Sequence, residues 1–238
     1  MNSIILGESA KDTVIFLHGW GGDASAFLFC AERLASEFRC VMPELAGFGK
    51  SGEPERAYTV RDYARDVLDL ADGLGAETFV LVGHSFGGRV AVELAAAHGE
   101  RVRALVLVDA AGLRPRRKPS YFFRVALHKL LKRLGKAGLK GSSDYRALSP
   151  VMKATFVNVV NYDQTPQLAH IACPTAVFWG RDDRDTPVYM AKKFLRGIRD
   201  SALFMLDGGH FAYLSDPTFF TVLHAFLGGV REGKRVEK

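Results

Sequence analysis

Short apolar runs recur along the chain, and longer segments with a helical spacing of apolar residues separate them. The runs are four or five residues long, rich in β-branched and aromatic residues, and bounded by Gly, Asp or Pro. This pattern is typical of parallel strands that are covered on both faces of a sheet. We therefore expect a weaker strand at residues 38–42, a short edge strand at 4–6, and buried strands at 14–17, 79–82, 104–108, 176–179 and 202–206.

The segments between these strands carry the apolar spacing of amphipathic helices. Thr59 is suited to cap one of them at its N-terminus, and Gly75 is suited to end it. Strands that alternate with helices predict a doubly wound α/β fold, with a mostly parallel sheet of about seven strands flanked by helices. The expected helices lie at residues 24–35, 60–74, 86–97, 188–196 and 211–227.

The alternation stops between residues 112 and 172, where no convincing strand is found. Two helical stretches lie in this segment, at 121–134 and 150–160. A long insertion in an α/β domain is usually functional, and often a lid. We interpret residues 112–172 as a small helical lid inserted after the sixth strand. Residues 1–111 and 173–238 then form the core domain.

The net charge of +6 is concentrated in one segment. Residues 114–140 contain ten Lys or Arg and no acid, which leaves 22 basic against 26 acidic residues elsewhere. Aromatic and aliphatic residues interleave with these charges at helical spacing, so we expect an amphipathic helix with a solvated basic face and no nucleic-acid partner. Weak contact of residues 114–140 with an anionic substrate or membrane surface is the alternative.

The three cysteines, Cys30, Cys40 and Cys173, lie in apolar stretches and are odd in number. Buried free thiols in a reducing compartment are the expected state. The N-terminus has no signal-peptide pattern, and no apolar run is long enough to span a membrane. We therefore expect a cytoplasmic protein without stable membrane insertion. The spacing of Cys and His resembles no zinc site, so neither a metal nor a cofactor is expected.

The strongest chemical signal is the hexapeptide Gly83-His84-Ser85-Phe86-Gly87-Gly88, between an apolar strand and an Ala-rich helix. A serine on this sharp turn is exposed as a nucleophile. Small residues two before and two after it are needed because the backbone passes close to itself. The start of the following helix offers free N–H groups to a developing oxyanion.

A second glycine-rich turn, His18-Gly19-Trp20-Gly21-Gly22, follows the strand at 14–17. We assign the oxyanion hole to the backbone N–H groups of Trp20 and Phe86. His18 could be a base, but we interpret it as a structural histidine that fixes this turn.

Two further motifs follow the last two expected strands. One is the stretch at 180–187, which contains Asp182 and Asp183, and the other is Gly208-Gly209-His210. A serine hydroxyl needs a base within hydrogen-bond reach, and the base needs a carboxylate to fix its tautomer. His210 can be the base, and one of these aspartates can orient it.

Together these motifs resemble the α/β-hydrolase superfamily over residues 13–112 and 172–227. The resemblance implies that Asp183, in a GxxD motif, is the acid; Asp182 is second, and Asp109 is a rarer position. It also implies the chain order Ser, Asp, His. The loop at 43–51 departs from the family pattern with Glu44 and Ala46. Because that loop is structural in most members, the departure leaves the catalytic assignment unchanged.

The resemblance implies a serine hydrolase with the triad Ser85, Asp183 and His210, acting through an acyl-enzyme. A carboxylesterase on small or medium acyl esters is expected from what is commonest in the family. The alternatives are a hydrolase of carbon–carbon bonds in vinylogous diketones and a non-catalytic ligand-binding member. Trp20, Phe86 and Phe211 are the expected substrate-binding residues.

Overall fold

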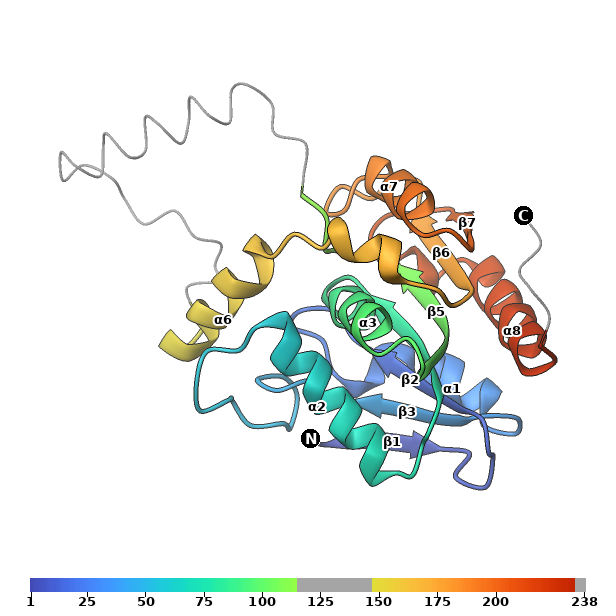
Figure 1. Cartoon of the computed structure of the whole chain (residues 1–238), viewed down its shortest axis with the longest axis horizontal. Coiled ribbons are helices and arrows are strands. Elements are labelled where there is room, and N and C mark those ends of the chain that lie inside the picture. The colour runs from blue at the N-terminus through green and yellow to red at the C-terminus, as the bar shows by residue number, and fades with distance from the viewer. Residues whose placement is uncertain (115–146, 234–238) are drawn as a thin grey trace.

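Seven apolar segments form one sheet in the computed structural model, which describes residues 1–114 and 147–233 (Figure 1). The order across the sheet is β1-β3-β2-β4-β5-β6-β7. Only β1 runs antiparallel to its neighbour, and the other pairs are parallel. This confirms the expected doubly wound, mostly parallel sheet. The strands are β1 (Ser3–Leu6), β2 (Thr13–Leu17), β3 (Arg39–Pro43), β4 (Phe79–His84), β5 (Val102–Val108), β6 (Thr175–Gly180) and β7 (Ser201–Leu206).

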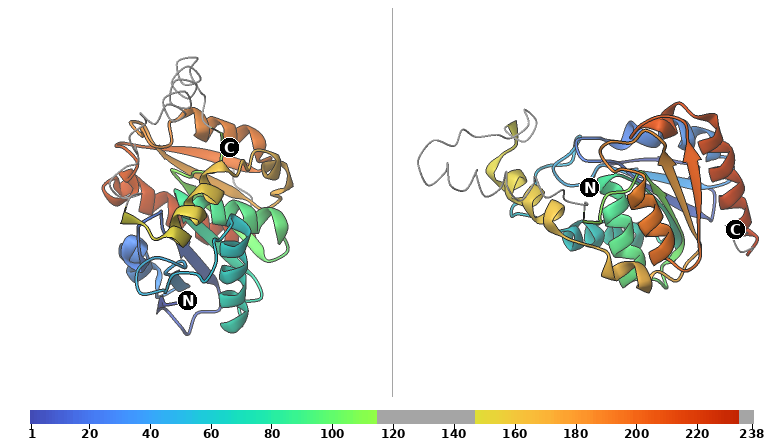
Figure 2. Two further views of the ribbon diagram at one scale, coloured as in Figure 1. Left: turned by 90° about the vertical axis from the view of Figure 1, so that its left-hand side faces the viewer. Right: turned by 90° about the horizontal axis from the view of Figure 1, so that it is seen from above.

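Helices cover both faces of the sheet, because successive side chains of a strand point to opposite sides (Figure 2). In β2, Ile15 and Leu17 join one apolar core, whereas Val14 and Phe16 join the other. The first core is completed by α2 (Val60–Gly73), α3 (Phe86–Ala97) and α7 (Tyr189–Gly197), and the second by α1 (Leu28–Leu34) and α8 (Pro217–Arg231).

Capping residues set the limits of these helices. Thr59 caps α2: its hydroxyl accepts from the N–H of Asp62, while the Asp62 carboxylate accepts from the N–H of Thr59. The helix expected at 211–227 is instead a 3₁₀ turn, η3 (Ala212–Leu214), followed by α8. Pro217 occupies the first turn of α8 and Asp216 caps it, so the helix cannot extend backwards.

The helix expected at 24–35 is likewise divided, into the 3₁₀ turn η1 (Ala24–Phe27) and α1. Asp23 caps η1 by accepting a hydrogen bond from the N–H of Ser25. The Phe27 backbone is not helical, with φ at −120° and ψ at 14°, and this separates the two elements.

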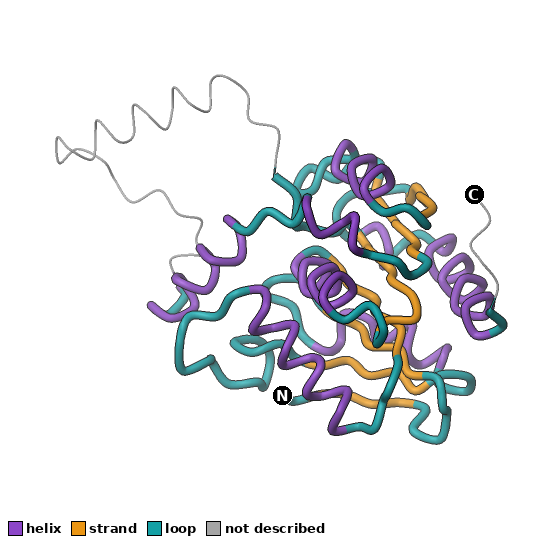
Figure 3. The backbone as a smooth tube through the Cα atoms, in the orientation of Figure 1, coloured by secondary structure: helices purple, strands orange, loops and turns teal. Residues whose placement is uncertain are grey.

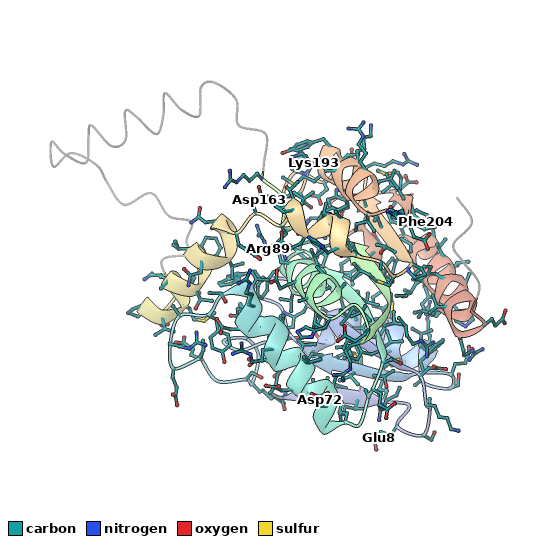
Figure 4. The ribbon with its side chains drawn as sticks, in the orientation of Figure 1. Glu8, Asp72, Arg89, Asp163, Lys193 and Phe204 are labelled. Carbon is teal, nitrogen blue, oxygen red and sulfur yellow. The ribbon has the colours of Figure 1, made fainter. Side chains whose placement is uncertain are left out.

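The insertion follows β5, which is the fifth strand along this chain and not the sixth, because only β1 precedes β2. Its described part contains α6 (Pro150–Asn161) and the 3₁₀ helix η2 (Pro166–His170). The ends of the insertion meet where the N–H of Gln164 donates to the carbonyl of Gly112, 2.9 Å away. Arg89 of α3 lies beside this junction and donates to the carbonyl of Tyr162 (Figure 4). The expected helix at 121–134 and nearly all of the basic segment 114–140 lie outside the described residues.

A long loop joins β3 to α2 (Figure 3). Glu44, where the resemblance noted above leads us to expect an aspartate, lies in this loop. Its carboxylate accepts from the side chain of Asn2 at 2.7 Å and from the N–H of Lys50 at 2.6 Å. The longer side chain therefore serves as a structural acceptor inside this loop.

Cys30, Cys40 and Cys173 are buried free thiols, as expected. In the described part of the chain, no helix combines the length and the hydropathy needed to cross a bilayer.

Candidate active site

The site lies at the carboxyl ends of five neighbouring strands. In the sheet these strands are ordered β2-β4-β5-β6-β7. The loops that follow them carry Trp20, Ser85, Asp109, Asp183 and His210 in turn. Ligand and catalytic sites of open α/β sheets form at this edge, because the loops after parallel strands gather there.

Ser85 stands at the junction of β4 and α3 with strained backbone angles, φ at 51° and ψ at −111°. A positive φ on a residue with a side chain costs on the order of 1–3 kcal/mol and occurs mainly at functional sites. The strain is held by three hydrogen bonds: Ser85 donates its N–H to Val108, and its carbonyl accepts from Gly88 and Ala111.

Two glycines make the turn at Ser85 possible. A Cβ added to Gly83 would lie 2.6 Å from the carbonyl oxygen of Gly87, and one added to Gly87 would lie 2.1 Å from that of Leu17. Both distances are closer than atoms can approach. The side chain of Ser85 is half-buried among buried neighbours, so it is presented at the surface of the elbow.

His210 and Asp183 form a hydrogen-bonded pair. The Nδ1–H of His210 donates to Asp183 Oδ2 over 2.8 Å, and the Asp183 side chain has no exposed surface. Asp183 also accepts from the N–H groups of Asp185 and Thr186 and from the Thr186 hydroxyl at 2.6 Å. Burial opposes its ionisation, but the hydrogen bonds from His210 and Thr186 outweigh burial and lower the pKa of Asp183 to about 2. The carboxylate is therefore ionised and fixes the tautomer of His210.

The three aspartates considered from the sequence have different environments. Asp182 is exposed, and its N–H donates to the carbonyl of Gly208. Asp109 is fully buried at the end of β5, with φ at 43°. Burial, together with the neighbouring Asp183 carboxylate, raises the pKa of Asp109 to about 8. Asp183 is thus the aspartate that pairs with His210.

Asp109, Asp183 and His210 each have one oxygen or nitrogen within 4.8 Å of the other two. Such a set could in principle hold a cation. However, the Nδ1 of His210 is hydrogen-bonded to Asp183. We therefore interpret the set as an acid–base pair with a second carboxyl behind it.

The turn after β2 is fixed by His18. Its Nε2 accepts from the N–H of Leu45 at 3.0 Å, and its Nδ1–H donates to the carbonyl of Gly19 at 2.7 Å. Burial lowers the pKa of His18, so the ring stays neutral. These bonds agree with a structural histidine. Within the described residues, the N–H groups of Trp20 and Phe86 have no hydrogen-bond acceptor and are free for a ligand.

An aromatic cluster surrounds the Trp20 side chain. Its indole makes edge-on contacts with the rings of Phe48, Phe86 and Phe156, at centroid distances of 4.9, 5.2 and 5.1 Å. Phe86 is buried, whereas Phe211 is 57% exposed and contacts the ring of His210. The structure thus brings Trp20 and Phe86 together and places Phe211 beside His210.

Several residues of the site were not singled out from the sequence. Phe156 lies on α6, and nothing in its local pattern indicates that it reaches Trp20. Thr186 lies three residues after Asp183, a spacing at which a hydroxyl can reach the carboxylate. His84 lies inside the elbow motif, and nothing in that motif indicates its contact with His210.

Comparison with known proteins finds a family model, curated relatives and solved structures that are similar to this chain. Residues 12–138 match the family model described as alpha/beta hydrolase fold. The AB hydrolase superfamily protein YisY of Bacillus subtilis is 29% identical, over 85% of this chain and 86% of that protein. A 2-hydroxy-6-oxo-6-(2'-aminophenyl)hexa-2,4-dienoic acid hydrolase of Metapseudomonas resinovorans is also 29% identical, over 87% and 80%. Among solved structures, a thermophilic esterase from Thermogutta terrifontis superposes with a TM-score of 0.74 at 24% identity, covering 96% of this chain and 93% of that one.

Proposed function

The chain belongs to the alpha/beta hydrolase fold family, and on this basis we propose that it is a serine hydrolase that cleaves carboxylic esters through an acyl-enzyme. The observation that carries the proposal is the His210–Asp183 hydrogen bond of 2.8 Å, found in the same chain as the strained elbow of Ser85. A hydroxyl, an imidazole and a buried carboxylate are the groups that acyl transfer to serine requires.

In the proposed reaction, the hydroxyl oxygen of Ser85 attacks the ester carbonyl while the Nε2 of His210 takes its proton. Nε2 has a free lone pair because Nδ1 carries the proton donated to Asp183. The negative charge on the carbonyl oxygen is stabilised by the N–H groups of Trp20 and Phe86. The alcohol leaves with the proton from His210, and a water activated in the same way then releases the acid.

The test is a panel of p-nitrophenyl esters of increasing acyl length, measured with the purified protein. Saturable hydrolysis that peaks at one acyl length is the expected result. No hydrolysis of any ester, together with covalent labelling by a serine-directed phosphonate, would instead indicate a ligand-binding member with an intact site.

A carbon–carbon hydrolase is the second candidate, because one of the relatives is a hydrolase of a dienoic acid. The substrate in the name of that relative is an acid, so it carries a carboxylate that a neutral ester lacks. Faster turnover of a 2-hydroxy-6-oxo-dienoic acid than of every neutral ester would favour this function over the esterase.

We further propose that residues 112–172 act as a cap that selects substrates. Support comes from the ring contact of Phe156 on α6 with Trp20 and from the hydrogen bond of Tyr58 N–H to Thr155.

We also propose a cytoplasmic location, which the three free, buried cysteines support.

A further inference from the structure

His84 is the last residue of β4 and directly precedes Ser85, and its ring is 2% exposed. Its Nε2 lies 2.9 Å from the main-chain carbonyl oxygen of His210, which is 126 residues away in sequence. A carbonyl can only accept, so Nε2 carries the proton and donates it. His84, the neighbour of the proposed nucleophile, thus donates a hydrogen bond to the main chain of His210, the proposed base.

We propose that His84 is a positioning residue for the reaction, which holds the main chain of His210 in register with the elbow of Ser85. This inference rests on the proposed function. The proposed reaction assigns neither the proton transfer nor the oxyanion hole to His84, so its proposed role is exerted through its hydrogen bond to His210.

The hydrogen bond from His84 adds a restraint to the glycine-containing loop that carries His210. The loop begins with Gly208, with φ at 132°, and Gly209, and two glycines in succession leave the backbone with many accessible conformations. The carbonyls around His210 are bonded within the main chain: Gly208 accepts from Asp182, Gly209 from Ala212 and Phe211 from Leu214. The carbonyl of His210 has no other donor within residues 1–114 and 147–233.

His210 is therefore held at two points. Asp183 fixes its ring at Nδ1, and His84 fixes its main chain. The bond at Nδ1 restrains the ring, and the bond from His84 is the one that restrains the His210 carbonyl itself, so that together they limit where Nε2 points. A misplacement of about 1 Å in a catalytic group can reduce the rate about a hundredfold.

The surroundings of His84 keep its ring neutral and in one orientation. Burial and the adjacent His210 lower the pKa of His84 to about 4. Its Nδ1 edge faces Gly19 so closely that a Cβ on that residue would lie 2.9 Å away. The ring of His84 thus contacts the turn of the proposed oxyanion hole on one side and His210 on the other.

A simple packing role is the competing explanation, because the ring also lies 4.8 Å from those of His210 and Tyr213 and 5.1 Å from Phe211. Three substitutions separate the two roles. His84→Phe fills the space without a donor. His84→Gln places an amide N–H as many bonds from Cβ as Nε2, and His84→Asn places it one bond short. His98→Asn, at a largely exposed histidine outside residues 112–172, is the control.

The experiment measures kcat, KM and melting temperature for each variant, together with the NMR resonance of the His210 Nδ1 proton. We expect His84→Asn and His84→Phe to lose about 10- to 100-fold in kcat with little change in KM. Their Nδ1 proton should exchange faster with solvent, and His84→Gln should recover most of the rate. Full activity of the folded His84→Phe variant, or equal losses in His84→Gln and His84→Phe, would overturn the proposal.

The NMR measurement needs no turnover, so it remains informative if the protein hydrolyses no ester. An unchanged Nδ1 resonance in His84→Asn would then refute the positioning role independently of the proposed function. If His84→Phe does not fold, the comparison of His84→Gln with His84→Asn still separates positioning from packing. Equal kcat values for these two variants would refute the positioning role.

Discussion

Asp109 accepts a hydrogen bond from the N–H of Gly180 over 2.8 Å through one carboxyl oxygen, while its other oxygen is buried without a partner in the described residues. Asp183, by contrast, receives donors on both oxygens. Two buried carboxyls this close do not both ionise readily, so the charge belongs to Asp183 and the proton to Asp109.

An ionised Asp183 beside a protonated Asp109 predicts how the free energy of unfolding depends on pH. The pKa of Asp109 is about 8 in the fold and about 4 in the unfolded chain. The unfolded state therefore loses this proton first as pH rises, and the contribution of Asp109 to the free energy of unfolding falls between about pH 4 and pH 8. Each unit of pKa difference corresponds to about 1.4 kcal/mol.

The substitution Asp109→Asn keeps the shape of the side chain and removes its titratable carboxyl group. Its free energy of unfolding, relative to wild type, should rise steadily from pH 4 to pH 8 in denaturant melts. A difference that stays constant across this range would show that Asp109 is ionised in the fold.

Ser85→Ala should abolish ester hydrolysis, because loss of a serine nucleophile costs on the order of a millionfold in kcat. The fold should survive, since the substitution removes one half-buried hydroxyl and leaves the backbone hydrogen bonds of the elbow in place. Ser215→Ala, which loses only a 3.3 Å bond to Ala212, is the matched control. Retention of more than a few per cent of activity would exclude Ser85 as the nucleophile.

Asp183→Asn should lose about 10⁴-fold in kcat, because an amide cannot hold the required tautomer of His210. Asp182→Asn should stay within about twofold of wild type, as an exposed side chain away from the pair. Steady-state kinetics on the best ester distinguish the two. A larger loss of kcat in Asp182→Asn than in Asp183→Asn would identify Asp182 as the acid of the triad. No loss of kcat in either variant would point to Asp109.

Phe156→Ala should change acyl-chain preference and lower kcat/KM about three- to tenfold. The ring contact with Trp20 contributes about 0.5–1.5 kcal/mol beyond buried area, and its loss loosens the turn that carries the proposed oxyanion donor. Val160→Ala, on an exposed side of the same helix, is the control. Equal ester profiles for both variants and the wild type would contradict a role of α6 in substrate choice.

Most of the fold follows from local patterns. Buried parallel strands are apolar throughout, and Gly, Asp and Pro mark their ends, so all seven strands could be located from the sequence. The helices were predicted less well where a cap was overlooked. Asp216 and Pro217 are a start signal in the sequence, and they divide the expected 211–227 helix.

The site could be predicted only in part. The elbow of Ser85 is recognisable because strand, glycine spacing and helix agree. The choice of Asp183 over Asp182 came from family resemblance. The two aspartates are adjacent, and only the conformation of the loop decides which side chain faces His210. Contacts such as that of Phe156 with Trp20 join distant segments and leave no mark on local periodicity.

The position of β7 at the margin of the sheet has a consequence for inactivation. His210 follows this outermost strand, whose central residues are half-exposed and which, among the described residues, pairs on one side only. Marginal strands open at lower free energy than the middle of a sheet. Mild denaturation should therefore displace His210 while β2, β4 and β5 remain intact. The proposed ester hydrolysis should then be lost before the fold is, and it should return when β7 pairs again.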